Sequence, residues 1–176
     1  MPKAVWRGGG GNDKRKALVN GFHDHPLCDV GWTKAHASDP KCKQFLSPAE
    51  QMRYRYIVSI EGNDVATNLK WIMASNSLCL MPAPVYETWF MEGTLQPGFH
   101  YVQLRSDFAD LEEKILHYEN HPNQAREIVR NANAYVEQFA HKRREQVLSL
   151  LVLYKYFALT GQLEPTPKVA ALWNHP

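Results

Sequence analysis

Residues 3–15, Lys-Ala-Val-Trp-Arg-Gly-Gly-Gly-Gly-Asn-Asp-Lys-Arg, join a short apolar segment to a run of glycines and a helix start. Residues 3–7 are predicted to form a strand, and Asn12 or Asp13 can cap the helix that follows. Glycines let a backbone approach a phosphate closely, and a helix start offers unpaired amides and the positive end of its dipole. The stretch has neither the Gly-Lys-Ser/Thr of a Walker A loop nor the last glycine of a dinucleotide-binding turn. It therefore predicts a strand–turn–helix unit, whose turn is either a phosphate loop or a flexible connection.

The same alternation of strand and helix patterns continues along the chain. The expected strands are residues 3–7, 27–32, 56–60, 77–81 and 99–104, and the expected helices are 14–22, 65–75, 108–120, 122–138 and 143–159, with short helices after Ser47 and around 87–92. Strands separated by helices are typical of a parallel sheet that is covered on both faces. We therefore expect an α/β fold, a Rossmann-like parallel sheet with helices on both faces and C-terminal helices. Residues 1–160 would form this domain, and residues 161–176 a Pro-containing tail.

The composition fits one ordinary domain. The chain has 176 residues, of which 44% are hydrophobic and 22% charged. These values exclude a disordered or collagen-like chain. The net charge of +2 predicts no nucleic-acid partner. An odd number of cysteines, three, indicates a reducing compartment. Because the N-terminus also shows no apolar leader segment, we expect a cytoplasmic protein.

The last expected helix carries a basic cluster, residues 141–144, followed by an apolar stretch from Val147 to Leu159. The stretch is shorter than the ~20 apolar residues that a bilayer span needs. One interpretation is a helix packed on the core with a solvated basic start. The other is a peripheral contact with the inner face of the cell membrane, made by the segment from Arg143 to Leu159.

Charged residues surround the glycine turn, and a second turn follows the strand expected at residues 56–60. Arg7, Lys14 and Arg15 can add charge-assisted hydrogen bonds to a diphosphate. The second turn, residues 60–67, reads Ile-Glu-Gly-Asn-Asp-Val-Ala-Thr. Glu61 can accept hydrogen bonds from a ribose or sugar hydroxyl pair. Alternatively, Gly62 only makes the turn and Asp64 only caps the next helix.

The sequence predicts no metal site. His23, Asp24, His25 and Cys28 lie close together, with His36 and Cys42 further along, but none of them forms a recognised zinc-binding pair. No Gly-x-Ser-x-Gly elbow, His-Glu-x-x-His motif or Asp-x-Asp pair is present. Any sugar-nucleotide chemistry would therefore use Arg, Lys and helix dipoles instead of a bound divalent ion.

Several short motifs occur in the order found in one known family. They are Val5-Trp6-Arg7-Gly8 with Arg15, Arg53-Tyr54-Arg55-Tyr56 leading into Ile60-Glu61-Gly62, Leu69-Lys70, Ala74-Ser75-Asn76-Ser77, Glu87-Thr88-Trp89-Phe90, the stretch from Leu95 to Tyr101, Asp107, Asp110-Leu111 and Ala125-Arg126-Glu127-Ile128. Through these motifs the chain resembles the C-terminal half of glycosyltransferase family 90. This family comprises lipopolysaccharide-core and capsule-associated enzymes and the eukaryotic protein O-glucosyltransferases. The Glu61-Gly62-Asn63-Asp64 turn is more similar to the bacterial branch.

The resemblance implies one half of a GT-B glycosyltransferase, which binds a nucleotide-sugar donor, typically UDP-linked, without a metal or other cofactor. The implied donor-binding residues are Arg7, Gly8, Gly9, Arg15, Glu61, Gly62, Asn63, Asp64, Val65 and Ala66. Arg15 would neutralise the diphosphate as it leaves. The O-glucosyltransferases carry Arg and Ser where this chain has Glu61 and Ala66, which leaves those two donor contacts open. The implied acceptor is a glycan or lipid-linked acceptor, such as the lipopolysaccharide core.

The catalytic residue of this family is expected in the half that precedes the Trp-Arg-Gly motif. No general base is therefore assigned in this sequence, although Asp24, Asp64 and Asp107 are available carboxylates. Two other functions remain open. One is a non-catalytic nucleotide-binding domain for a different nucleotide, and the other is a module that binds a membrane surface or a partner through its last helix.

Overall fold

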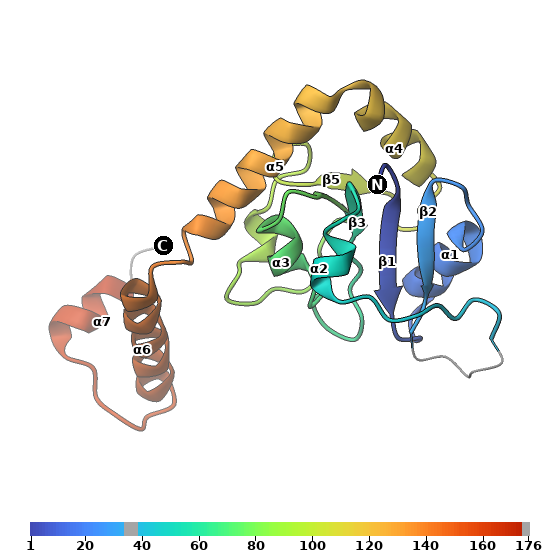
Figure 1. Ribbon diagram of the computed structural model, residues 1–176. Helices are drawn as coiled ribbons and strands as arrows, with labels where there is room; N and C mark the ends of the chain where they lie inside the picture. Colours follow the sequence, from blue (N-terminus) through green and yellow to red (C-terminus); the bar gives the residue numbers. More distant parts are fainter. Residues whose placement is uncertain (34–38, 174–176) are drawn as a thin grey trace. The chain divides into compact units, whose positions relative to one another are not determined.

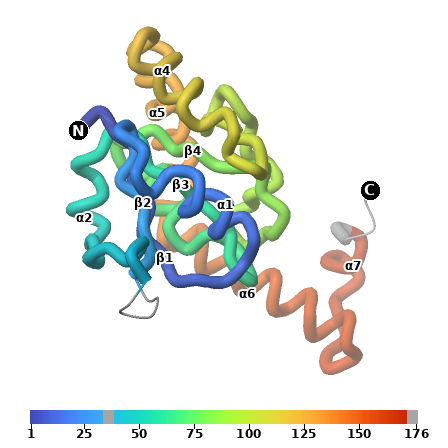
Figure 2. The backbone as a smooth tube through the Cα atoms, turned by 90° about the vertical axis from the view of Figure 1, so that its right-hand side faces the viewer, coloured from blue at the N-terminus to red at the C-terminus, as the bar shows by residue number. Residues whose placement is uncertain are grey.

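The computed structural model describes residues 1–33 and 39–173, and its centre is a parallel sheet of five strands in the order β2-β1-β3-β4-β5 (Figure 1). The strands are β1 (Ala4–Gly8), β2 (Cys28–Trp32), β3 (Tyr56–Val58), β4 (Leu78–Pro82) and β5 (Val102–Leu104). Strand β1 lies between β2 and β3 (Figure 1), and Val5 stands opposite both Asp29 and Ile57. Figure 2 shows the same strands in a view turned by 90° about the vertical axis. All pairings are parallel, which confirms the expected α/β class.

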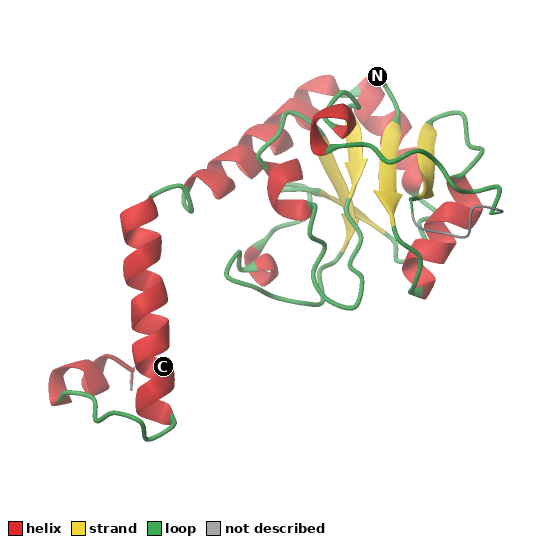
Figure 3. Cartoon of the chain, turned by 60° about the horizontal axis from the view of Figure 1, so that its bottom comes forward, coloured by secondary structure: helices red, strands yellow, loops and turns green. Residues whose placement is uncertain are grey.

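Helices connect and follow the strands, as Figure 3 shows. They are α1 (Asp13–Phe22), α2 (Pro48–Gln51), α3 (Leu69–Met73), the 3₁₀ helix η1 (Glu92–Thr94), α4 (Leu111–Asn120), α5 (Pro122–Glu137), α6 (Lys142–Leu159) and α7 (Pro167–Trp173). Helix α2 begins as its sequence predicts, because Ser47 and Glu50 form a reciprocal capping box and Pro48 takes the first helical position.

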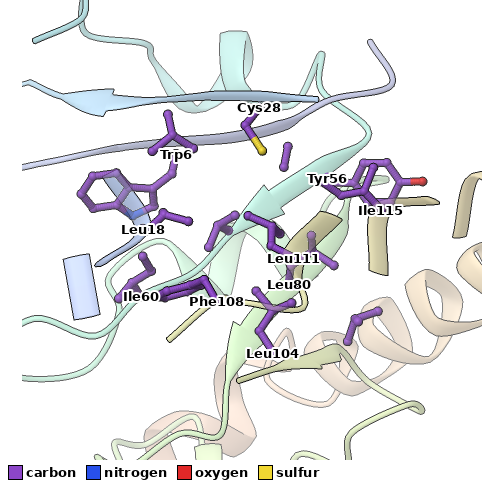
Figure 4. Packing of buried hydrophobic residues seen from close by; sticks show 14 of the residues in the cluster. Trp6, Leu18, Cys28, Tyr56, Ile60, Leu80, Leu104, Phe108, Leu111 and Ile115 are labelled. Carbon is purple, nitrogen blue, oxygen red and sulfur yellow. The ribbon is translucent and has the colours of Figure 1, made fainter. Parts of the chain in front are cut away.

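The sheet is buried on both faces. On one face, strand residues such as Trp6, Tyr56 and Leu80 pack with Leu18 of α1 and Leu111 of α4 (Figure 4). The alternate strand residues Val5, Ile57, Cys79 and Met81, which point to the other face, are at most 3% exposed. On that side α3 buries Leu69, Ile72 and Met73 and contacts β4. Parallel strands require this double cover, and it explains their nearly continuous apolar sequences.

The helix expected over residues 65–75 is shorter than predicted and begins at Leu69. The preceding residue, Asn68, is bound to the end of β3: its side chain accepts a hydrogen bond from the Ser59 hydroxyl (3.0 Å) and donates one to the Val58 carbonyl (3.1 Å). These bonds hold residues 61–68 as a loop. Asp64, the expected helix cap, instead accepts a hydrogen bond from the backbone N–H of Val65 (2.8 Å).

The short helix expected around residues 87–92 is replaced by η1. Met91, just before η1, has a left-handed φ of 53°, which no α-helix can contain. The buried carboxylate of Glu92 accepts hydrogen bonds from the Thr88 backbone N–H (2.7 Å) and pairs with Lys70 (2.8 Å), so the segment closes into a turn. A left-handed φ of 61° at Phe108 likewise delays the start of α4 from residue 108 to Leu111.

The chain divides into two compact units, Met1–Val136 and Glu137–Pro176. A single domain over residues 1–160 stays a prediction. The second unit contains α6, none of whose residues is buried, and α7, which lies within the expected Pro-containing tail. Residues 174–176 of that tail lie outside the described part of the chain. In the described ranges, no helix combines the length and the apolar character that crossing a membrane requires.

Candidate functional site

Strands β1 and β3 end where the order of the sheet reverses. From β1 the chain passes to β2 on one side and then returns to β3 on the other side of β1. Open α/β sheets bind ligands at such a switch point, beyond the carboxyl ends of the strands. A pocket of ≈ 170 Å³ lies there, lined by Trp6, Arg7, Gly8, Gly9, Arg15, Gln51, Ile60, Thr67 and Asn68. The structure thus brings the glycine turn together with the residues that follow β3.

Asn12 joins the elements of this pocket. Its side-chain oxygen caps α1 by accepting a hydrogen bond from the Arg15 backbone N–H (3.0 Å). Its side-chain amide donates to the carbonyl oxygens of Glu61 (2.9 Å) and Gly62 (3.1 Å). One side chain therefore holds the start of α1 against the loop after β3. The first amides of α1 are left without partners inside the helix and carry the positive end of its dipole.

Arg15 is the cationic group of the pocket. Its guanidinium donates to the carbonyl oxygens of Gly9 (3.4 Å) and Ile60 (3.3 Å) and lies 5.9 Å from the centre of the Trp6 ring. Its Nε atom is buried without a hydrogen-bond partner. No carboxylate of the described residues lies within 4.0 Å of it. Burial lowers the pKa of Arg15, which nevertheless stays protonated because arginine titrates far above neutral pH. The pocket thus holds a partly buried positive charge that an anion would neutralise.

Gly62 allows Arg15 to reach the end of β3. A Cβ atom at position 62 would lie 2.8 Å from the Nη2 atom of Arg15, closer than two such atoms can approach. Gly9 differs, because a Cβ there would meet nothing within 4 Å. The backbone at Gly9 is therefore open for the close approach of a ligand.

Arg7 lines the pocket, but its charge is already paired. Its guanidinium donates to the Asp29 carboxylate (2.8 Å) and to the Asp29 carbonyl (2.6 Å), and its side chain is only 6% exposed. Lys43 and Tyr54 also bind this carboxylate. Burial alone would raise the pKa of Asp29, but the hydrogen bonds from Tyr54, Arg7 and Lys43 outweigh it and lower the pKa to about 2. Arg7 thus ties β1 to β2, in contrast to Arg15.

Glu61 is also occupied by the protein itself. One carboxylate oxygen accepts hydrogen bonds from the backbone N–H groups of Val85 (2.8 Å) and Tyr86 (3.0 Å), and the other pairs with Lys14 (3.3 Å). The carboxylate therefore fixes the loop after β4 to the loop after β3. Three of its roughly four acceptor positions are used, so little capacity is left for a ribose hydroxyl pair.

Residues 63–66 of the second turn do not line the Arg15 pocket. Val65 and Ala66 line a separate niche with Glu61 and Lys14, of ≈ 10 Å³, which is about the space of one water molecule. Asn63 and Asp64 are exposed on the loop. The two ends of that turn, Ile60 and Thr67, line the pocket instead, together with Gln51 and Asn68, which sequence reasoning missed. Asn68 directly follows the turn, so extending the expected range by one residue would have included it.

None of the three candidate carboxylates lines the Arg15 pocket. The side chain of Asp24 is 95% exposed and lies 3.6 Å from His23. Asp107 pairs with Arg105 (2.9 Å), and its pKa is lowered to about 2 chiefly by the hydrogen bond from that guanidinium. In the described ranges, no three His, Cys, Asp or Glu side chains gather in a group that could hold a metal ion. His36 lies outside the described residues.

The fold and this pocket define an α/β protein of the Rossmann-like type, with a cationic ligand pocket at its switch point. The chain belongs to glycosyl transferase family 90, whose family model matches residues 1–166. It is 58% identical over 162 residues to the O-glucosyltransferase LpsA of Dichelobacter nodosus, covering 92% of this chain and 50% of that protein. It is 28% identical to the human protein O-glucosyltransferase 3, over 88% of this chain and 31% of that protein. It is 29% identical to an O-glucosyltransferase rumi homolog of Anopheles gambiae, over 77% of this chain and 36% of that protein.

The chain therefore spans about half the length of the bacterial relative and about a third of the animal ones. The higher identity to the bacterial protein agrees with the branch that the Glu61-Gly62-Asn63-Asp64 turn indicates.

Proposed function

We propose that this chain is the donor-binding part of a glycosyltransferase that uses a nucleotide-sugar, UDP-linked, as its donor. Family membership and the relatives named O-glucosyltransferases support the transfer of a sugar. The observation that carries the donor site is Arg15, a partly buried cation with an unpartnered Nε and no carboxylate neighbour among the described residues. A diphosphate at the ends of β1 and β3 supplies the missing negative charge.

In the proposed reaction, the oxygen of an acceptor hydroxyl forms a bond to the anomeric carbon of the donor sugar. The bond from that carbon to the β-phosphate oxygen breaks, and its electron pair leaves with the nucleoside diphosphate. The hydroxyl proton passes to a general base, which we do not assign to this chain because Asp24, Asp64 and Asp107 lie outside the pocket. Arg15 and the first amides of α1 stabilise the charge that develops on the leaving diphosphate.

The donor is a substrate in this proposal, and no cofactor or metal ion is needed. Arg15 and the dipole of α1 neutralise the diphosphate in place of a divalent ion. The affinity for UDP should accordingly be the same with EDTA as with added Mg²⁺. A requirement for the metal would contradict this part of the proposal.

The size of the pocket limits what this chain binds by itself. Sites for small organic ligands usually measure about 300–1,000 Å³, and the Arg15 pocket measures ≈ 170 Å³. We therefore assign the diphosphate to it and expect other walls around the sugar and the base. The affinity of this chain alone should be in the micromolar to millimolar range.

Calorimetric titration of the purified chain tests the donor class. We expect saturable binding of UDP and UDP-glucose, and weaker binding of ATP and NAD. Equal binding of all four would indicate a site for phosphates in general, and tighter binding of NAD or ATP would favour a domain for another nucleotide. No binding at millimolar ligand by a folded chain would overturn the donor site.

We further propose an acceptor on a cell-surface glycan or its lipid-linked precursor, such as the lipopolysaccharide core, and a cytoplasmic location. The acceptor class rests on the resemblance to the bacterial branch of the family, which the 58% identity to a bacterial O-glucosyltransferase supports. The location rests on the three free cysteines, which are typical of a reducing compartment. Transfer of labelled glucose from UDP-glucose to glycan acceptors by the longer protein is the test. Labelling of free water-soluble sugars alone would contradict a lipid-linked acceptor.

A second candidate function is a contact with an anionic membrane surface through α6. The large apolar side chains of this helix are exposed, for example Leu150 (66%) and Val152 (70%), and the basic residues Lys142, Arg143 and Arg144 begin it. Co-sedimentation with vesicles that contain anionic lipid, but not with neutral vesicles, is the expected result. Equal failure with both kinds of vesicle would remove this candidate and leave the part from Arg143 to Leu159 as a surface for another protein.

A further inference from the structure

A second and larger hollow lies at the opposite edge of the sheet. It measures ≈ 520 Å³ and is lined by Arg55, Asn76, Leu78, Tyr118, Pro122, Ala125, Arg126, Val129, Arg130 and Asn133. Arg55 precedes β3, and Asn76 precedes β4. In a parallel sheet these positions share the amino edge, whereas the Arg15 pocket lies at the carboxyl edge. The hollow, which we call the arginine groove, is therefore distinct from the donor site.

The groove carries an excess of positive charge. Arg55 is paired with Glu119, which also accepts a hydrogen bond from the Tyr56 hydroxyl (2.7 Å). Arg126 donates to the neutral side chain of Asn123, and no carboxylate of the described residues lies within 4.0 Å of it. The side chain of Arg130 has neither a hydrogen bond nor an ion pair with any described residue. Two of the three guanidinium groups thus have no counter-charge among the described residues.

The placement of these two arginines is unfavourable for the helix alone. Arg126 and Arg130 stand four residues apart on α5, so their side chains are neighbours on the helix surface. Like charges at this spacing destabilise a helix. An anion bound between them would turn the repulsion into two charge-assisted contacts. Guanidinium groups also match the oxygen geometry of a phosphate.

The floor of the groove is apolar. It includes Leu78, which is 1% exposed, together with Ala125 and Val129 of α5. Asn133 is fixed at one end, because its side-chain amide donates to the carbonyl oxygens of Met73 (2.7 Å) and Ser75 (2.9 Å). The groove therefore offers charge at its rim and apolar surface below it.

We propose that the arginine groove is a second ligand site, which binds a phosphate monoester attached to an apolar body. The phosphate lies between Arg126 and Arg130, and the apolar part covers Leu78 and Val129. A lipid phosphate and a free organic phosphate share this chemistry. The proposal is independent of the donor site, since the two sites have no residue in common.

Site-resolved NMR titration of the ¹⁵N-labelled chain is the test, with inorganic phosphate and a monomeric short-chain phosphatidic acid as probes. We expect the phosphatidic acid to shift the signals of Val129 and of the Asn76 and Asn133 side chains. Arg126→Ala/Arg130→Ala should weaken this binding about tenfold or more, because two charge-assisted contacts are lost. The matched control is Lys16→Ala/Arg105→Ala, which removes two exposed cations outside the groove and should leave the affinity unchanged.

The two probes also distinguish the source of the ligand. Tighter binding of phosphatidic acid than of phosphate supports a lipid phosphate, and equal binding supports a free phosphate. If neither probe shifts the groove signals at ~10 mM, a concentration that detects even weak sites, the proposal is wrong. It is also wrong if the control pair weakens binding as much as the groove pair does. UDP should meanwhile shift Gly9 and Gly62 in every variant, so a failure of the donor site would be seen separately.

Discussion

The guanidinium of Arg15 lies against Gly62, so close that a Cβ on Gly62 would stand 2.8 Å from its Nη2 atom. These residues come from the first helix and from the loop after β3, and Arg15 lines the proposed donor pocket. Because Gly62 has no side chain, the guanidinium of Arg15 can take this position.

Replacing Gly62 with alanine should displace Arg15 without unfolding the chain, because the clash involves the far end of a flexible side chain. We expect the affinity for UDP to fall about tenfold, the effect of weakening one charge-assisted contact. Calorimetry measures this. The control is Gly10→Ala, where a Cβ meets nothing within 4 Å. If both variants bind UDP equally well, Gly62 does not position Arg15 for the ligand.

Replacing Glu61 with alanine should lower stability, because the backbone N–H groups of Val85 and Tyr86 lose their acceptor. The expected loss in the free energy of unfolding is ~1–3 kcal/mol, the cost of unsatisfied polar groups. Urea denaturation measures it, with the exposed Glu127→Ala as control. A variant of unchanged stability that binds UDP-sugars more weakly would show that Glu61 contacts the donor instead.

Stability should fall in acid through Asp29. Its pKa in the folded chain is about 2, below the ordinary 3.8, so on acidification the unfolded chain takes up this proton first. Ionised Asp29 therefore contributes on the order of 2 kcal/mol to the free energy of unfolding. This contribution is complete above about pH 5 and is lost as the pH falls towards 2. Asp29→Asn should flatten the pH dependence of unfolding in this window. Asp24→Asn, at an exposed carboxylate, should leave it unchanged. An Asp29→Asn variant with the original acid dependence would contradict the assigned network.

The amino-acid sequence alone was sufficient to predict those features of the fold that depend on neighbouring residues. The alternation of strands and helices predicts the parallel sheet, the asparagine before α1 is the cap that it uses, and the capping box predicts the start of α2. The glycine turn and the turn after β3 are both found at the switch point, as ligand-binding turns of such a fold would be.

The rest depends on partners that are distant in the sequence. Glu61 is engaged by amides 24 and 25 residues away, and Arg7 by Asp29, 22 residues away, so neither pairing has a local signal. The late start of α3 follows from the bonds between Asn68 and the end of β3. The arginine groove likewise combines three separate segments of the chain.

The affinity of the Arg15→Ala variant for UDP tests the central claim most directly. Calorimetry should show a loss of ~1.5–3 kcal/mol, the worth of a hydrogen bond to a charged group. The control is Lys16→Ala, which removes an exposed cation from the same helix, where it pairs with Asp13 (3.3 Å). We predict that Lys16→Ala binds UDP like the original chain. Equal affinity of the original chain and Arg15→Ala, with the fold intact, would contradict the assignment of the diphosphate to this pocket.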